Sequence, residues 1–250
     1  MAKVIAIINQ KGGVGKTTTA VNLSALLGAM GQRVLMIDLD PQGNTTSGLG
    51  MEVDDKSIYE VIMGRMKLNL SIAGSDVRLA NAELELVEVE KREYRLKTAV
   101  QSVQQDFDFI FIDCPPSLGL LTINALGAAD SVLIPIQCEY YALEGVASLM
   151  NTISRVKKTI NPHLEIEGVL LTMLDGRTNL GLQVVDEVKK HFKKQVYATV
   201  IPRSVRLGEA PSHGEPIHVY DKRSAGCVAY VNLAKEVLKR NNIKVKEFKL

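Results

Sequence analysis

Cysteine, long apolar runs and low-complexity segments are scarce or missing in this 250-residue sequence. Its three cysteines, Cys114, Cys138 and Cys227, are far apart and form no CxxC pair, which disfavours a disulfide framework or a zinc site and fits a reducing cytoplasm. No stretch approaches the roughly 18–20 unbroken apolar residues of a membrane span, and the N-terminus does not read as a signal peptide, so export is not expected. Because no linker rich in Pro, Gly or Ser divides the chain, residues 1–250 are expected to form a single domain.

Net charge is also small, but it is unevenly distributed. The chain has 30 Lys/Arg and 28 Asp/Glu, which gives a formal net charge of +2. Residues 1–125 carry 12 basic and 15 acidic side chains, whereas residues 126–250 carry 18 and 13. The total excludes a permanently polycationic protein, and the second half is where a local basic face is expected.

Short β-branched runs alternate with longer amphipathic stretches along the chain. Strands of a parallel sheet covered on both faces are predicted over residues 4–8, 34–38, 107–113, 132–137, 168–174 and 196–201. Helices are predicted over residues 16–30, 96–105, 143–158, 180–194 and 227–240. The alternation predicts an α/β fold with a doubly wound, mostly parallel sheet and helices on both faces. Residues 41–95 are the least regular region and are expected to form an excursion between strands.

A glycine-rich loop, IINQKGGVGKTTT at residues 7–19, follows the first predicted strand and opens the first helix. This is the context of a phosphate-binding P-loop, in which glycines let backbone N–H groups face phosphate oxygens at a helix N-terminus. Lys16 is expected to reach the β- and γ-phosphates, and the Thr17 hydroxyl to bind Mg²⁺. The nucleotide-binding residues predicted in this loop are Lys11, Gly12, Gly13, Val14, Gly15, Lys16, Thr17 and Thr18.

The loop departs from the ordinary P-loop, because Gln10 stands where the first glycine of that pattern falls and Lys11 is added. This variant resembles the deviant Walker A motif of the ParA/MinD group of ATPases. Four further segments resemble the chromosomal ParA (Soj) family: DLDPQGN at 38–44, FIDCPPSLG at 111–119, QCEYYALEG at 137–145 and IPRSVRLGEAPS at 201–212. The resemblance covers residues 2–238 and implies a P-loop NTPase fold, ATP hydrolysis with Mg²⁺, and a homodimer in the ATP state.

Three aspartates close predicted strands at the sheet edge where ligands bind in open α/β folds. Asp113 resembles a Walker B aspartate, which holds Mg²⁺ through water beside Thr17, and a carboxylate that caps the following loop is the alternative. Asp38 and Asp40 alternate along one strand, and one of them can orient or partly deprotonate an attacking water. The resemblance assigns that catalytic role to Asp40 and places Asp38 near the Mg²⁺ shell.

A second lysine in one phosphate loop is costly unless it faces additional negative charge. The resemblance implies that Lys11 crosses to the partner subunit's phosphates in an ATP-sandwich dimer, where it acts with Lys16 and Asp40 as a catalytic group. A solvated loop lysine is the alternative. Gly12 is expected where the two backbones meet, so that a side chain there would block the dimer.

Adenine contacts are less visible in the sequence. The loops after two later strands flank the base in the family that this chain resembles, and they contain Met173, Pro202 and Arg203. For these residues a core methionine and an ordinary turn are the alternatives.

A lysine-rich flank is predicted on the segment 182–195. Val185, Val188 and Phe192 share one helical face, and Lys189, Lys190, Lys193 and Lys194 fall together beside it at 100° per residue. Such a flank can neutralise DNA phosphates without reading bases, although a solvated face is the alternative. The resemblance places Lys193 and Arg223 among DNA-contacting residues, and a dimer would double the patch and make DNA affinity depend on ATP.

The resemblance implies a switch for chromosome or plasmid segregation that is cytoplasmic and nucleoid-associated. Nonspecific DNA and a ParB-like centromere-binding protein that stimulates hydrolysis are the partners implied, together with a replication initiator. The alternative is a MinD-like, membrane-recruited ATPase that positions cell division, but the period-two alternation of residues 241–250 makes no helical apolar face, so no stable membrane association is expected. A nitrogenase-reductase-like electron carrier is disfavoured, because it needs cluster-ligating cysteines and none here is suitably placed. An amidoligase is disfavoured as well, because it needs an added substrate domain, for which 250 residues leave little room.

Overall fold

The fold is described by a computed structural model for residues 1–53, 56–68, 71–139, 144–244 and 248. These residues form a seven-stranded sheet in the order β3-β2-β4-β1-β5-β6-β7, and each pairing between neighbours is parallel. The strands are β1 (Lys3–Ile7), β2 (Val34–Asp38), β3 (Ile72–Ala73), β4 (Phe109–Asp113), β5 (Ser131–Gln137), β6 (Glu165–Leu174) and β7 (Val196–Pro202). The doubly wound α/β prediction is confirmed.

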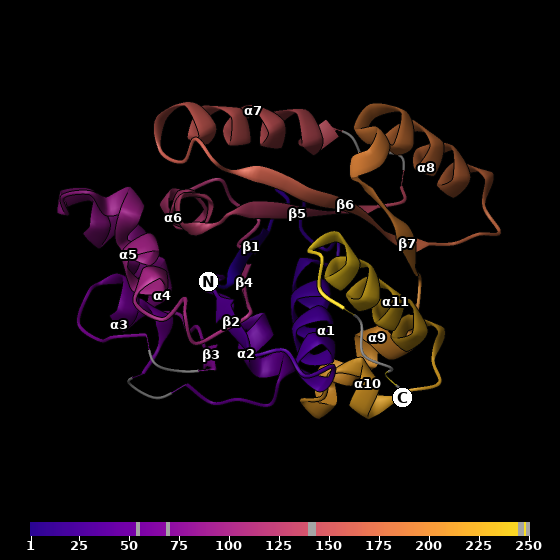
Figure 1. Cartoon of the computed structure of the whole chain (residues 1–250), viewed down its shortest axis with the longest axis horizontal. Helices are drawn as coiled ribbons and strands as arrows, with labels where there is room; N and C mark the ends of the chain where they lie inside the picture. Colours follow the sequence, from indigo (N-terminus) through magenta and orange to yellow (C-terminus); the bar gives the residue numbers. More distant parts are fainter. Residues whose placement is uncertain (54–55, 69–70, 140–143, 245–247, 249–250) are drawn as a thin grey trace.

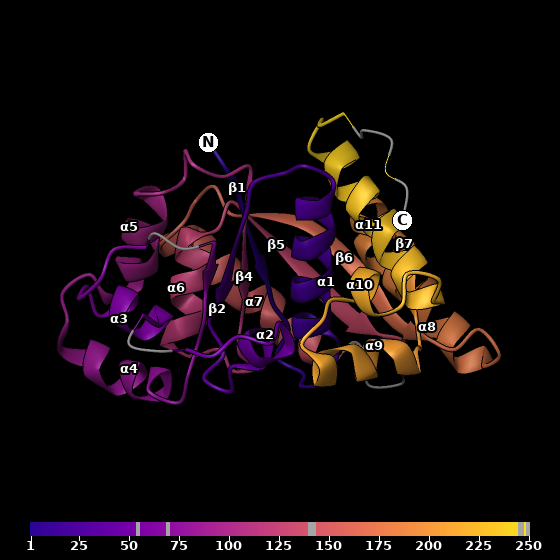
Figure 2. The ribbon, with the colours of Figure 1, turned by 90° about the horizontal axis from the view of Figure 1, so that it is seen from below.

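Helices cover both faces of this sheet (Figure 1). One face carries α3 (Ile58–Ile62), α4 (Leu79–Glu85), α5 (Arg95–Gln101), α6 (Leu120–Ala128), α7 (Glu144–Thr159) and α8 (Asn179–Phe192). The other face carries α1 (Lys16–Ala29), α9 (Val205–Glu209), α10 (Ile217–Tyr220) and α11 (Ala225–Arg240), with α1 and α11 side by side (Figure 2). The short α2 (Asn44–Gly48) follows β2.

Two apolar layers result from the alternation of side chains along the strands. In β1, Val4 and Ala6 pack into the layer with α3–α8, whereas Ile5 and Ile7 pack against α1 and α11. All four side chains are fully buried, as expected for a parallel strand that is covered on both faces. The three cysteines lie unpaired and buried in these layers.

The excursion at residues 41–95 contains more regular structure than its sequence indicates. It holds α2, α3, α4, the two-residue strand β3 and two 3₁₀ turns, at Leu86–Glu88 and Arg92–Tyr94. The sequence does not predict β3, because two residues give no measurable alternation. Leu143, the first residue of a predicted helix, lies outside the described residues, as do 245–247 and 249–250 of the C-terminal segment.

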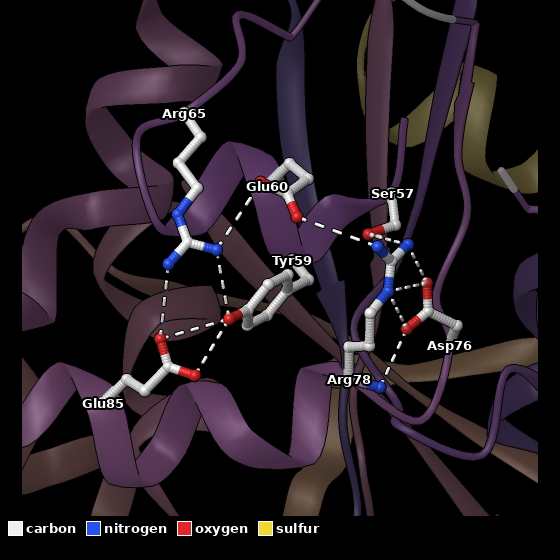
Figure 3. Close-up of polar contacts among 7 residues, drawn as sticks. All are labelled: Ser57, Tyr59, Glu60, Arg65, Asp76, Arg78 and Glu85. Atoms are coloured by element: carbon white, nitrogen blue, oxygen red, sulfur yellow. Dashed lines mark hydrogen bonds and ion pairs between the residues drawn. The ribbon is translucent and has the colours of Figure 1, made fainter. Parts of the chain in front are cut away.

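A polar network ties α3 to α4 in this excursion (Figure 3). The Tyr59 hydroxyl donates to Glu85 at 2.9 Å and accepts from Arg65 at 3.2 Å. The guanidinium groups of Arg65 and Arg78 both approach the Tyr59 ring, at 5.3 and 6.0 Å from its centroid. Arg78 also pairs with Asp76 at 2.7 Å. Single exposed ion pairs contribute little to stability, but a shared aromatic anchor fixes the relative position of these groups.

The prediction for the end of the lysine-rich helix is wrong. The α-helix α8 ends at Phe192. The next residue, Lys193, has a left-handed φ of 49° and begins a 3₁₀ turn, η4 (Lys193–Gln195). The chain must reverse there, because the edge strand β7, which pairs in parallel with β6, begins at Val196. Only Lys189 and Lys190 therefore follow the helical spacing of α8, and Lys193 and Lys194 leave it.

Within the described residues, no helix is long and apolar enough to cross a membrane.

Asn161 lies between α7 and β6 and contacts the C-terminal end of α6. Its buried side-chain amide donates to the carbonyl oxygens of Leu126 and Ala129, at 2.9 and 2.7 Å. Asn161→Ala is expected to lower the free energy of unfolding by about 2–3 kcal/mol, because two buried acceptors lose their donor. Urea denaturation measures this change. Asn151→Ala, at an exposed position of α7, serves as the control and is expected to change stability by less than about 0.5 kcal/mol.

Candidate nucleotide-binding site

The glycine-rich loop joins β1 to α1 at the carboxyl edge of the sheet. Gly13 and Gly15 have left-handed φ values of 72° and 90°, which side-chain-bearing residues adopt only with strain. Gly15 is the N-cap of α1 and offers no side-chain cap, so the first N–H groups of this 14-residue helix are available to an anion. The carbonyl of Val14 accepts from the Thr172 hydroxyl at 2.8 Å, which ties the loop to β6.

A cavity of about 400 Å³ opens over this loop. Its lining comprises Gly12, Gly13, Gly15, Lys16, Thr17, Thr18, Asp40, Gln42, Asn44, Pro116 and Met173. The predicted loop residues Gly12, Gly13, Gly15, Lys16, Thr17 and Thr18 thus share one cavity with the predicted catalytic residue Asp40. Val14 is not part of the lining, because its side chain is buried against the core.

A second cavity of about 250 Å³ adjoins the first and shares Gly15, Thr18 and Met173 with it. The three adenine candidates, Met173, Pro202 and Arg203, all line this second cavity. Met173 has a left-handed φ of 53° at the shared wall, an unfavourable conformation that is typical of functional sites. Arg203 is held by Glu139 at 2.9 Å.

Asp113 lies fully buried at the base of the site. Its Oδ2 accepts from the hydroxyls of Thr17 and Thr45 at 2.8 and 2.7 Å, while its buried Oδ1 has no partner among the described residues. Burial and the nearby charge of Asp38 raise the pKa of Asp113 to about 7. A buried carboxylate oxygen without a partner, next to the Thr17 hydroxyl, fits a hard cation such as Mg²⁺.

Asp38 and Asp40 differ sharply in their surroundings. Both carboxylate oxygens of Asp38 are occupied: Oδ2 accepts from the backbone N–H and the hydroxyl of Thr46, and Oδ1 accepts from the backbone N–H of Asp40. Burial raises the pKa of Asp38. Asp40 lines the cavity, and only its Oδ1 accepts a hydrogen bond within the described part of the chain, from the backbone N–H of Gln42 at 3.0 Å. Only Asp40 is therefore placed to contact a molecule in the cavity directly.

The two loop lysines are also arranged differently. The Lys16 side chain is buried, and its ammonium donates to the carbonyl of Lys11 at 3.3 Å. Burial lowers the pKa of Lys16, and Asp113 acts in the opposite direction. Lys11 is half-exposed, and its ammonium forms no hydrogen bond or ion pair with the described part of the chain. A Cβ added at Gly12 would meet no atom within 4 Å.

The predicted DNA-contacting residues are exposed but do not form one patch in a single chain. The side chains of Lys189, Lys190, Lys193, Lys194 and Arg223 are all on the surface, and Lys190 pairs with Glu187 at 3.3 Å. Arg240, at the end of α11, donates to the backbone of Gln195 in η4, whereas Arg223 precedes the start of α11. The 16 residues of α11 therefore separate Arg223 from η4 by roughly 24 Å.

Several residues of the site are missed by the sequence reasoning. Gln42, Asn44 and Pro116 line the main cavity, and Thr45 contacts Asp113. They stand in the segments 38–44 and 111–119 or directly after them, so the motifs locate the region but not these roles. Lys235, Lys239 and Lys244 likewise add basic side chains beside Arg240, around a hollow near the η4 lysines.

The chain is similar to known proteins along most of its length. Residues 2–166 match the family model of an AAA domain. The chain is 59% identical over 249 residues to the sporulation initiation inhibitor protein Soj of Bacillus subtilis, covering 95% of this chain and 98% of the relative. It is 50% identical over 256 residues to the chromosome partitioning protein ParA of Myxococcus xanthus, covering 98% and 90%.

A solved structure with the same fold contains the expected ligands. The cobyrinic acid a,c-diamide synthase of Mycobacterium smegmatis, crystallised with an ATP analogue and magnesium, matches with a TM-score of 0.85 and 38% identity. The match covers 96% of this chain and 95% of that chain.

Replacing Asp113 with Asn is expected to stabilise the metal-free protein at neutral and higher pH. The pKa of Asp113 is raised from 3.8 to about 7, so the carboxyl binds its proton more tightly in the folded state, and its ionisation opposes folding as the pH rises through this window. The gain from Asp113→Asn should be about 2–4 kcal/mol above pH ~7 and vanish below pH ~4.

Denaturation in EDTA at several pH values measures this gain. Asp106→Asn, at an exposed position, is the control. A gain that is the same at every pH would contradict the buried, unfavourable charge.

Proposed function

Because the chain belongs to the ParA/Soj family of chromosome-partitioning proteins, we propose that it is an ATPase that works as a DNA-segregation switch. Its ATP-bound dimer binds DNA without sequence preference, and hydrolysis releases it. The observation that carries this proposal is the set of groups at one site. Residues of the glycine-rich loop and Asp40 line a single cavity, and the buried Asp113 accepts a hydrogen bond from Thr17 in that lining.

The two adjoining cavities suit the two halves of ATP. The triphosphate lies over the backbone N–H groups at the start of α1, with Lys16 as the cation that contacts it. Thr17 and Asp113 would hold Mg²⁺, and the ion would supply positive charge that offsets the charge of the phosphates. The adenine lies in the second cavity against Met173, Pro202 and Arg203. Asp38 is proposed to make no direct contact with the phosphates, because both of its carboxylate oxygens already accept hydrogen bonds.

Asp40 is proposed to orient the attacking water, because it is the carboxylate that faces the cavity. Asp40→Ala is expected to keep ATP binding within about threefold and to lower the hydrolysis rate by at least about 100-fold. Binding of a fluorescent ATP analogue and release of phosphate under single-turnover conditions measure the two effects separately. Hydrolysis by Asp40→Ala at the wild-type rate would overturn this role.

We propose a dimer that closes around two nucleotides, and the exposure of Lys11, Gly12 and Gly13 in the loop supports it. Lys11 is proposed to reach the phosphates bound by the partner subunit and to stabilise charge as the γ-phosphoryl group leaves. A Cβ at Gly12 would meet nothing within 4 Å in one chain, so a side chain there is compatible with the fold and is proposed to clash with the partner subunit. Gly12→Val therefore gives a folded protein that is unable to dimerise.

Dimerisation is proposed to make DNA binding depend on ATP. Lys189, Lys190, Lys193, Lys194 and Arg223 are proposed to contact phosphates. In one subunit they lie near the two ends of α11, so a dimer presents two copies of each cluster to one duplex and gains avidity. A ParB-like protein is the proposed activator of hydrolysis, and nucleoid association and regulation of a replication initiator follow from the same proposal.

Salt-dependent DNA binding tests the function as a whole. With ATP, affinity for random-sequence DNA is expected to fall about 100-fold or more between about 50 and 200 mM salt, because several phosphates are neutralised. With ADP or with Gly12→Val, binding is expected to be at least about tenfold weaker, since avidity is lost.

Anionic liposomes replace DNA in a parallel experiment. Binding to liposomes alone would favour the membrane-recruited alternative and would overturn the DNA-switch proposal.

A further inference from the structure

Thr45 is a buried hydroxyl that the proposed chemistry does not yet use. We propose that Thr45 is a positioning residue of the metal site: together with Thr17 it fixes the carboxylate of Asp113 in the orientation that receives Mg²⁺. This inference rests on the proposed function, because it concerns the same cavity, but it assigns a role to a residue outside the phosphate loop and outside the cavity lining.

The geometry at Asp113 is the first observation. Thr17 and Thr45 donate to the same oxygen, Oδ2, from α1 and from α2, at 2.8 and 2.7 Å. Two donors from different helices define the plane of the carboxylate, whereas a single donor leaves it free to turn about its Cβ–Cγ bond. They also leave Oδ1 buried without a partner among the described residues. A buried oxygen in this state is costly unless it receives a ligand.

The anchoring of Thr45 is the second observation. The helix α2 has only five residues, too few to be stable by its own hydrogen bonds. It is held by Thr46, whose N–H and hydroxyl donate to Asp38 at 2.9 and 2.7 Å and whose hydroxyl accepts from the N–H of Ser75 at 2.9 Å. The hydroxyl of Thr45 is therefore positioned by β2 and by the excursion, independently of the phosphate loop.

The position of α2 also gives this contact a consequence for hydrolysis. Asp40, Gln42 and Asn44 line the cavity and lead directly into Thr45. One short segment thus places both the carboxylate proposed to orient water and the hydroxyl that orients the metal carboxylate. Loss of the Thr45 hydroxyl is expected to weaken Mg²⁺ binding about tenfold, in the range found for residues that orient metal ligands.

Three variants isolate the hydroxyl. Thr45→Val keeps the shape of the side chain and removes the donor, and Thr45→Ser restores the donor. Thr122→Val is the matched control. Thr122 lies on α6, is as buried as Thr45, and donates its hydroxyl to the backbone carbonyl of Ser117 at 2.7 Å. Mg²⁺ is titrated into each ADP complex, and the rise in melting temperature gives the half-saturating concentration. The Mg²⁺ dependence of ATP hydrolysis is measured in parallel, and ADP binding in EDTA serves as a check on the nucleotide site.

The expected result is a half-saturating Mg²⁺ concentration about tenfold higher for Thr45→Val and within about threefold of wild type for Thr45→Ser. Thr122→Val should melt at a lower temperature but keep the wild-type midpoint. A wild-type midpoint for Thr45→Val, or an equal shift for Thr45→Ser, would overturn the positioning role. If the variants show this order of Mg²⁺ midpoints but the wild-type protein hydrolyses no ATP, the proposed function fails and the role of Thr45 stands.

Discussion

The buried carboxylate of Asp113 is the constraint to which the rest of the site is fitted. It ends the interior strand β4, and hydroxyls from α1 and α2 converge on one of its oxygens. An ionised carboxylate in this position is unfavourable without compensation, as its raised pKa shows. The hydroxyls supply part of that compensation and Lys16 another part. The remaining deficit of positive charge is what suits the site to a bound cation.

Parallel topology brings these groups together. Since each pairing of the described strands is parallel, the loops after β1, β2, β4, β6 and β7 all emerge at one edge. The P-loop, Asp40, Pro116 and Arg203 come from the loops after β1, β2, β4 and β7, and Met173 lies at the end of β6 itself. Together they surround two adjoining cavities. The acidic first half of the chain supplies the carboxylates at this edge. The basic second half places its lysines around η4 and the end of α11.

A shared fold does not by itself select among the activities that such an edge can support. What narrows the choice is the set of groups in the loops. Asp40 can act on a molecule in the cavity, whereas Asp38, two residues earlier, is committed to holding α2. Lys16 is buried in the site, whereas Lys11 is half-exposed. The two aspartates differ in their hydrogen-bond partners and the two lysines differ in their burial, and their different proposed roles follow from these differences.

The sequence by itself determined the α/β class, six of the seven strands and the location of the phosphate loop, because periodicity and glycine spacing are local properties of the chain. It also determined that Asp38, Asp40 and Asp113 stand at strand ends. Only the tertiary structure separated Asp38 from Asp40, since that depends on Thr46 reaching back to β2. Only the tertiary structure ended α8 at Phe192 and gave Lys193 a positive φ, because a helical wheel contains no information on where strand β7 must begin. The contact of Thr45 with Asp113 spans 68 residues, and such a pairing is decided by packing rather than by any local pattern.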